Sequence, residues 1–278
     1  MPNRAAVDYS RAPLPLENMG RILKEKASSY RTAAPFPHLV VDGFFDDEAV
    51  LDKVLEEFPS KDQIKWATFD SYHEVKLASK GESQLGPFTR YLIYHLNSST
   101  FINFLVELTG IKGLIPDPHL EGGGLHQILR GGKLGVHADF NKHLKLNLDR
   151  RINLIVYLNK EWKEEYGGHI ELWDRKMEKC ERKVLPIFNR ILIFNTTDFA
   201  FHGHPEPLNC PEDKSRKSLA LYYYSNGRPE EELSADHSTI FKLRPGEKQV
   251  RTFKQVVNKF IPPIVHDIRF LLKRGSQH

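Results

Sequence analysis

Two histidines and an aspartate in this sequence have the residue types and the spacing of metal ligands. His137 and Asp139 form a His-x-Asp triplet, and His202 and His204 follow within the segment 201–205. Side chains at positions i and i+2 of a strand point to the same face, so His137 and Asp139 can bind one metal ion from one side. Either His202 or His204, from a distant strand, would supply the second imidazole. The sequence therefore predicts a metal site with two histidines and one carboxylate.

Arg216 and its neighbours form the second group that could do chemistry. Two histidines and one carboxylate on one face of an octahedral ion leave positions free for other ligands, as is typical of non-haem Fe(II) oxygenases. Those positions have to hold a co-substrate and O2. Arg216 could anchor a dicarboxylate, because a planar guanidinium pairs with a carboxylate through two hydrogen bonds. Arg216 is in phase with Ser218 in an apolar run that we expect to be a buried strand, and Lys217 is the alternative anchor.

Six segments resemble, in the same order, the prolyl-4-hydroxylase-like branch of the Fe(II)/2-oxoglutarate dioxygenases. They are V-H-A-D at 136–139, L-I-V-Y-L-N at 154–159, G-G-H-I-E-L at 167–172, N-R-I-L-I-F at 189–194, H-G at 202–203 and R-K-S at 216–218. The resemblance covers residues 126–224 firmly and the flanks loosely. Six segments in family order are much more specific than any one of them.

This resemblance implies a fold and a set of site residues. The fold is mainly β with flanking helices (α+β), around a double-stranded β-helix (jelly-roll) core. The implied ligands of Fe(II) are His137, Asp139 and His202, with His202 preferred to His204. The co-substrate 2-oxoglutarate would chelate the metal while its distal carboxylate pairs with Arg216, and three more residues would contact it: Tyr157, Ser218 and Gln127.

The implied activity is a 2-oxoglutarate-dependent hydroxylation. Such an enzyme uses O2 to hydroxylate a C–H bond of its substrate and releases succinate and CO2. The substrate could be a prolyl or other amino-acid residue, a free amino acid or a small metabolite, and the sequence does not separate these. Two alternatives are a cupin-like metalloenzyme that does not use 2-oxoglutarate and a non-catalytic jelly-roll binding module. The presence of Asp139 argues against a halogenase, in which a small residue typically replaces the carboxylate.

Hydrophobic periodicity divides the chain into four parts. Residues 1–13 are expected to be disordered, and residues 14–113 form a helix-rich flank of the catalytic domain. Its expected elements are a helix at 16–28, a strand at 38–42, a helix after Asp46 and an apolar helical stretch at 92–108 broken near 97–100. Residues 114–228 show short period-two runs separated by glycines, which indicates the jelly-roll core. Residues 229–278 form a basic tail with two expected helices.

Phase along two of these runs predicts which side chains face the site. In the run 152–159, Ile152, Leu154, Val156 and Leu158 form an apolar face, which we expect against the helices. The mixed face, with Asn153 and Tyr157, would line a cavity together with Arg216 and Ser218. Segments 62–90 and 140–150 are candidate lids, although 61–80 also suits a surface hairpin.

Bulk composition narrows the class of protein. The chain has 278 residues and a net charge of +4, which is too small to predict nucleic-acid binding by itself. Its two cysteines form no disulfide framework and no zinc-finger pattern, and they suit a reducing compartment. We find no signal-like stretch and no run of transmembrane length. A cytoplasmic protein that acts on a small-molecule or peptidyl substrate is expected. A homodimer through the C-terminal helices is a further prediction.

Overall fold

Antiparallel strand pairing dominates the structure, as the period-two runs predict. The computed structural model describes residues 13–248, so the N-terminal segment expected to be disordered lies almost entirely outside the described residues. The strands of the described part are β1 (His38–Asp42), β2 (Ala67–Asp70), β3 (Glu74–Ala78), β4 (Ile115–Pro116), β5 (Gly124–Ile128), β6 (Lys133–Ala138), β7 (Asp149–Tyr157), β8 (Ile170–Trp173), β9 (Cys180–Val184), β10 (Arg190–Asn195), β11 (His202–His204), β12 (Arg216–Ser225) and β13 (Ile240–Phe241).

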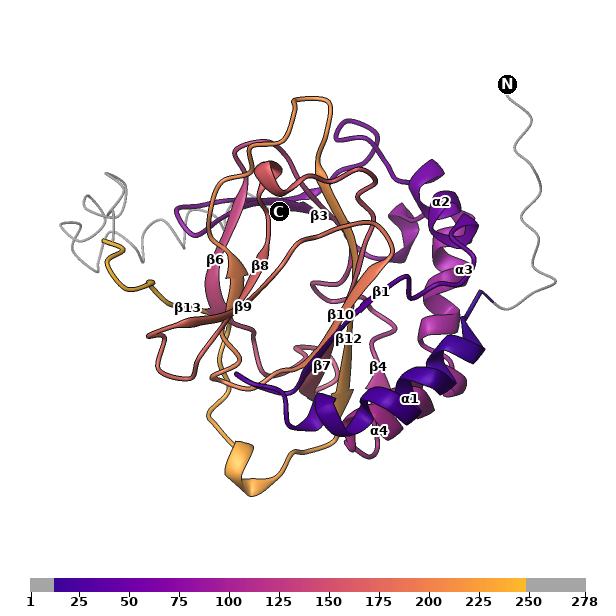
Figure 1. Cartoon of the computed structure of the whole chain (residues 1–278), viewed down its shortest axis with the longest axis vertical. Helices are drawn as coiled ribbons and strands as arrows, with labels where there is room; N and C mark the ends of the chain where they lie inside the picture. Colours follow the sequence, from indigo (N-terminus) through magenta and orange to yellow (C-terminus); the bar gives the residue numbers. More distant parts are fainter. Residues whose placement is uncertain (1–12, 249–278) are drawn as a thin grey trace, which may run out of the picture. The chain divides into compact units, whose positions relative to one another are not determined.

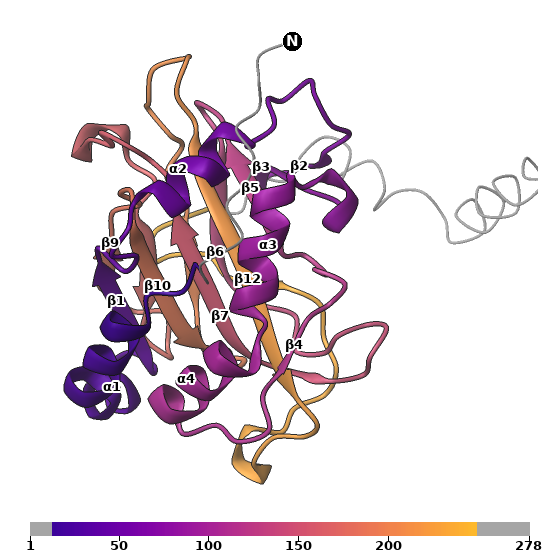
Figure 2. The ribbon, with the colours of Figure 1, turned by 90° about the vertical axis from the view of Figure 1, so that its right-hand side faces the viewer.

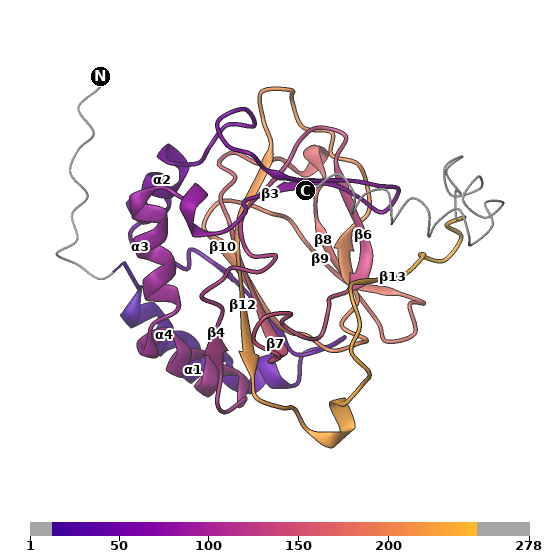
Figure 3. The ribbon, with the colours of Figure 1, turned by 180° about the vertical axis from the view of Figure 1, so that it is seen from behind.

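These strands form one continuous hydrogen-bonded sheet that curls into a nearly closed barrel. The order along its main path is β1-β10-β7-β12-β5-β3-β6-β11-β8-β9. One wall consists of β1, β10, β7, β12 and β5, and the other of β6, β11, β8 and β9 (Figure 1, Figure 3). β3 joins the walls, because it pairs with β5 at one end and with β6 at the other. This is the expected double-stranded β-helix.

The helices of the described residues cover one wall of the barrel. They are α1 (Leu16–Arg31), α2 (Ala49–Glu56), α3 (Pro87–Leu96) and α4 (Ser99–Thr109). Figure 2 shows them in front of β10, β7 and β12. The apolar stretch at 92–108 is broken where expected, between α3 and α4. No helix among the described residues is both long and apolar enough to cross a bilayer.

The predicted phase of β7 and β12 is confirmed by the packing. Ile152, Leu154 and Val156 belong to the main hydrophobic core, with side chains of all four helices such as Leu92 and Phe101. Each of these five side chains is 1% exposed or less. The opposite face of β7 is therefore free to carry polar groups toward the inside of the barrel.

The N-terminal flank contributes strands as well as helices. β1 pairs with β10 along five residues, and β2 and β3 form a hairpin whose second strand enters the sheet. Of the two interpretations of residues 61–80, the hairpin is the one that the structure shows. Its contact with both walls gives it a closing role in the barrel that the mixed polar sequence did not indicate.

The C-terminal segment differs from the expected helical tail as far as it is described. Residues 229–248 contain a 3-10 turn (Glu230–Glu232) and β13, which pairs with the end of β6. The backbone of β6 leaves hydrogen-bonding groups beyond the short β3 pairing, and β13 uses them. The chain divides after Pro245, and of the second part only residues 246–248 are described. The two predicted helices therefore fall outside the described residues.

Replacing Leu154 by Ala should destabilise the fold by roughly 2–5 kcal/mol. The substitution leaves a cavity beneath the helices, because the Leu154 side chain is fully buried. Urea unfolding measures this free energy. Leu144, which is 87% exposed, gives the matched control. Leu144→Ala should change the free energy of unfolding by about 0.5 kcal/mol or less. Equal effects of the two substitutions would contradict the assigned core.

Candidate metal centre

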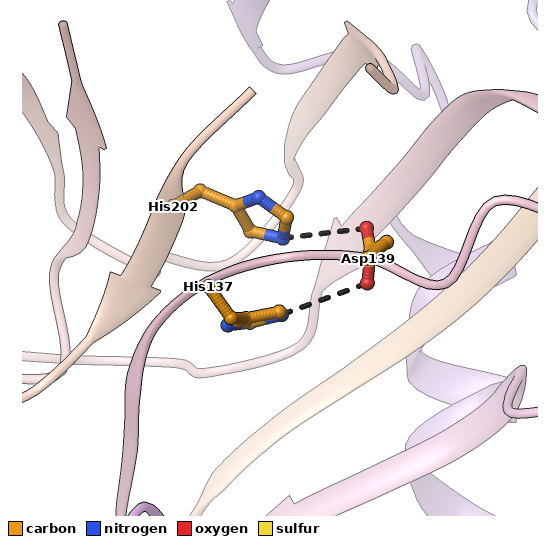
Figure 4. Close-up of side chains that lie close together, drawn as sticks. All are labelled: His137, Asp139 and His202. Atoms are coloured by element: carbon orange, nitrogen blue, oxygen red, sulfur yellow. Dashed lines mark ion pairs between the residues drawn. The ribbon is translucent and has the colours of Figure 1, made fainter. Parts of the chain in front are cut away.

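β6 and β11 place the predicted ligands opposite one another. In the antiparallel pairing, His202 lies directly across from His137, and their ring centroids are 4.4 Å apart. Asp139 follows β6 and turns its carboxylate toward both rings (Figure 4). Its Oδ1 lies 3.6 Å from Nε2 of His137, and its Oδ2 lies 3.6 Å from Nε2 of His202. Within residues 13–248, these three are the group whose ligand atoms all lie within 4.8 Å of one another.

Hydrogen bonds orient both imidazoles for metal binding. Nδ1 of His137 lies 2.9 Å from the carbonyl oxygen of Gly135, and Nδ1 of His202 lies 2.9 Å from that of Ala200. A carbonyl can only accept, so each Nδ1 carries the proton and each Nε2 keeps a lone pair. Histidine ligands of metal ions are commonly fixed in this way. The rings are therefore in the tautomer that a metal at the triad requires.

Charge and burial set suitable protonation states. Burial, helped by the nearby His137, lowers the pKa of His202 to about 4. Burial by itself would raise the pKa of Asp139, but the positive Arg150 and the adjacent histidines hold it well below the usual value. The carboxylate is thus ionised and the His202 ring neutral near pH 7. These are the states in which both side chains ligate metals.

His204 is not part of this group. The pairing of β11 with β6 is irregular between His202 and His204, and His204 lies across from Leu134. Its ring is 3% exposed, and neither ring nitrogen has a hydrogen-bond partner among the described residues. The structure therefore brings His202, rather than His204, to Asp139.

Arg216 is buried beside Tyr157 inside the barrel. Its Nε donates to the carbonyl oxygen of Gly168 at 3.0 Å, and its Nη2 donates to the Tyr157 hydroxyl at 3.4 Å. A Cβ on Gly168 would lie 3.0 Å from Cδ of Arg216, so the glycine makes room for the arginine. Ser218 lies across from Tyr157 and shares its face. Among the described residues no carboxylate pairs with this guanidinium, although it is only 5% exposed.

Gln127 is a correction to the predicted site. It lies across from Lys217, so its side chain is on the opposite face of the sheet from Ser218. There its amide donates to the Ser215 hydroxyl at 2.9 Å. The residue across from Ser218 is His126, one position earlier. A displacement of one residue reverses the face, and the sequence could not fix the register of β5 so closely.

Lys217, the alternative anchor, points away from the site. Its backbone N–H donates to Asn159 at 2.6 Å, and its Nζ lies 5.5 Å from the centre of the Phe58 ring, on the helix-covered side. Arg216 and Lys217 therefore face opposite sides of β12, and only Arg216 is near Tyr157.

Arg150 and Asn153 are site residues that we did not predict as such. The Asn153 amide donates to Oδ2 of Asp139 at 2.7 Å, and Nη2 of Arg150 lies 3.3 Å from the same oxygen. Asn153 was expected on the cavity-lining face, but Arg150 is out of phase with it. The pairing of β7 with β12 is irregular at Tyr223 and Tyr224, so that position 151 is skipped. Such a bulge re-aims a side chain and leaves no clear pattern in the sequence.

The lowered pKa of His202 gives a stability prediction. Without metal, the unfolded chain binds a proton at His202 below about pH 6.5, whereas the folded chain stays neutral to about pH 4. This stability is present above pH 6.5 and lost as the pH falls toward 4. With metal removed by a chelator, the free energy of unfolding should fall between pH 7 and pH 5 in both proteins. The fall should be about 2 kcal/mol smaller for His202→Gln than for wild type. Urea unfolding at both pH values measures the difference, and identical losses would contradict the assigned burial.

Comparison with known proteins agrees with this geometry. Residues 123–224 match the 2OG-Fe(II) oxygenase superfamily. The prolyl 3-hydroxylase OGFOD1 of Mus musculus is 22% identical over 198 residues, which are 68% of this chain and 33% of that protein. The chain thus spans about a third of the length of this curated relative.

Two solved structures share the fold. One is a prolyl hydroxylase from Trichoplax adhaerens in complex with a hypoxia inducible factor oxygen degradation domain peptide fragment. It is 17% identical, with a TM-score of 0.52, and the match covers 76% of this chain and 92% of that chain. The other is HygX from Streptomyces hygroscopicus with nickel and 2-oxoglutarate bound, with a TM-score of 0.50 at 13% identity, over 78% and 97%. The family match spans both strands of the triad and Arg216. The part of the chain that carries the triad and Arg216 is therefore similar to the 2OG-Fe(II) oxygenase superfamily, and the chain shares its fold with a prolyl hydroxylase.

Proposed function

We propose that this chain hydroxylates a C–H bond of an organic substrate, with Fe(II) held by His137, Asp139 and His202 and with 2-oxoglutarate and O2 as co-substrates. The observation that carries the proposal is that Arg216, a buried guanidinium with no carboxylate partner within residues 13–248, lies inside the same barrel as a buried His-Asp-His triad. A buried charge is costly unless it is paired. A dicarboxylate ligand would supply the missing partner.

The residues of the chain have separable roles in this proposal. Fe(II) and 2-oxoglutarate, when bound, supply the oxidising chemistry, with release of succinate and CO2. The triad offers one carboxylate and two imidazoles and leaves other positions of the ion free. The barrel wall keeps these groups from water, since His137 and His202 are each 4% exposed. The chain thus contributes binding, orientation and fixed charges rather than a redox group of its own.

The pocket for the distal carboxylate would consist of Arg216, Tyr157 and Ser218. Burial raises the pKa of the Tyr157 hydroxyl, although the positive Arg216 lowers it in part, so Tyr157 stays a hydrogen-bond donor. Both hydroxyls lie on the face of the sheet that carries Arg216. A carboxylate there would receive a charge-assisted bond from Arg216 and neutral ones from the hydroxyls. The cupin-like alternative leaves this arrangement without a purpose.

For the primary substrate, a prolyl residue within a peptide is the first class to test. Its support is the similarity to a prolyl 3-hydroxylase and to a prolyl hydroxylase solved with a peptide fragment. Other amino-acid residues, free amino acids and small metabolites are the competing classes. We further propose a cytoplasmic location, because Cys180 and Cys210 are both free thiols. A homodimer through the C-terminal segment stays a prediction.

Arg216→Ala should weaken 2-oxoglutarate binding by roughly 3–5 kcal/mol, because it leaves a buried carboxylate unpaired. This is two to three decades or more in affinity. Anaerobic titration of the Fe(II) protein with 2-oxoglutarate, followed by the weak visible charge-transfer band, measures it. Lys217→Ala is the matched control, since Lys217 is the adjacent cation on the opposite face. Loss of affinity in the control with an unaffected Arg216 variant would reassign the anchor.

Turnover gives the test of the substrate class. With Fe(II), 2-oxoglutarate and O2, we expect succinate release above the uncoupled background with proline-containing peptides, and a mass increase of one oxygen atom in the peptide. Asp139→Ala should abolish both signals through loss of a ligand. Turnover with free proline or a small metabolite alone would redirect the substrate to those classes. An Asp139→Ala variant with full activity would refute the triad.

A further inference from the structure

His204 is a buried histidine whose ring has no hydrogen-bond partner within residues 13–248. Its side chain is 3% exposed, and both Nδ1 and Nε2 are buried without a partner there. Buried polar groups are nearly always hydrogen-bonded, and one that is not destabilises the fold. The nearby His137 and His202 differ, because Nδ1 of each lies 2.9 Å from a backbone carbonyl oxygen. The ring of His204 therefore has a use other than stability.

The ring of His204 lies inside the barrel. Side chains two positions apart on a strand share a face, so His204 follows His202 on the inner face of β11. A Cβ on the intervening Gly203 would lie 2.6 Å from a carbonyl oxygen of β6, so β11 packs closely against that strand. Burial holds the pKa of His204 well below its usual value, and the positive charges of Arg216 and Lys76 lower it further. Such charge effects fade with distance, so both cations are near the ring.

His204 and Arg216 thus face one interior space, and each lacks an acceptor. The guanidinium of Arg216 has only the Gly168 carbonyl and the Tyr157 hydroxyl as partners among the described residues. Lys76 differs, because its Nζ lies 3.0 Å from the Glu74 carboxylate. A neutral imidazole offers one N–H donor, and a carboxylate has about four lone-pair sites. One carboxylate beside Arg216 can therefore accept hydrogen bonds from both side chains.

We propose that His204 is a second binding residue for the dicarboxylate co-substrate, with its ring N–H donating to the carboxylate that pairs with Arg216. This inference rests on the proposed function and adds a residue to the site. A hydrogen bond to an ionised acceptor is stronger than one between neutral groups. The same ring that destabilises the ligand-free protein would then strengthen binding of the ligand. Affinity and stability should consequently respond to His204 in opposite directions.

His204→Leu separates these two effects without turnover, since it removes both ring nitrogens and keeps a side chain of similar size. The dissociation constant of 2-oxoglutarate from the anaerobic Fe(II) protein, measured by calorimetry, should rise roughly ten- to hundred-fold. The urea midpoint of the metal-free protein should stay the same or rise, because an unsatisfied polar group is lost. His204→Gln keeps an N–H donor and should retain most of the affinity.

His38→Leu is the matched control, because it removes a buried histidine that has partners. His38 is also 3% exposed, but its Nδ1 lies 2.8 Å from the Phe36 carbonyl oxygen and its Nε2 lies 2.8 Å from Nη1 of Arg182. This substitution should lower the urea midpoint and leave the affinity for 2-oxoglutarate unchanged.

Each outcome supports or overturns the role of His204. A folded His204→Leu protein with the affinity of wild type overturns it. Failure of this variant to fold, or a loss of stability as large as that of His38→Leu, also overturns it, since the ring would then be needed by the fold. Equally weak binding by His204→Gln would attribute the effect to shape rather than to the N–H. Wild type that binds Fe(II) but not 2-oxoglutarate would instead count against the proposed function.

Discussion

The antiparallel pairing of β6 with β11 is the constraint on which the rest of the site depends. It sets His137 directly across from His202, although 65 positions separate them in the sequence. A register one residue different would turn one imidazole away from the barrel interior. The register is supported on both sides, because β11 also pairs with β8, and β6 also pairs with β3. The strand pairing within the barrel thus brings together two histidines that are distant in the sequence.

Burial then decides what each charged group inside the barrel does. Away from water an ionised side chain needs a partner. Asp139 has one in Arg150, so the triad is electrostatically complete before any metal binds. Arg216 has only neutral contacts, a carbonyl and a phenol, among the described residues. Arg150 is therefore paired with a carboxylate of the protein itself, whereas Arg216 needs an anionic ligand as its partner.

Much of the site followed from the period of two, and the errors follow from where that period breaks. His137 lies across from His202 with Asp139 just beyond β6, and Arg216, Tyr157 and Ser218 share a face because β7 and β12 alternate regularly at those positions. Gln127 was wrong by one residue of register, which depends on how β5 pairs with β12 and cannot be read from β5 alone. Arg150 was not predicted as a site residue, because a bulge in the pairing of β7 with β12 turns it toward the site. The pairing of β13 depends on a partner strand about a hundred residues earlier.

β13 gives the first ligand strand a dependence on a remote part of the chain. One edge of β6 is paired with β3 at its beginning and with β13 at its end, where Ile240 and Phe241 lie across from Ala138 and His137. The N–H of Lys242 adds a bond to Val136, and the Phe241 ring lies 5.5 Å from that of His137. The smallest piece of this chain that retains a complete metal-binding strand therefore extends to residue 242. A recombinant fragment ending at 228, where the jelly-roll pattern stops, would contain every ligand and still lack part of the scaffold that holds them.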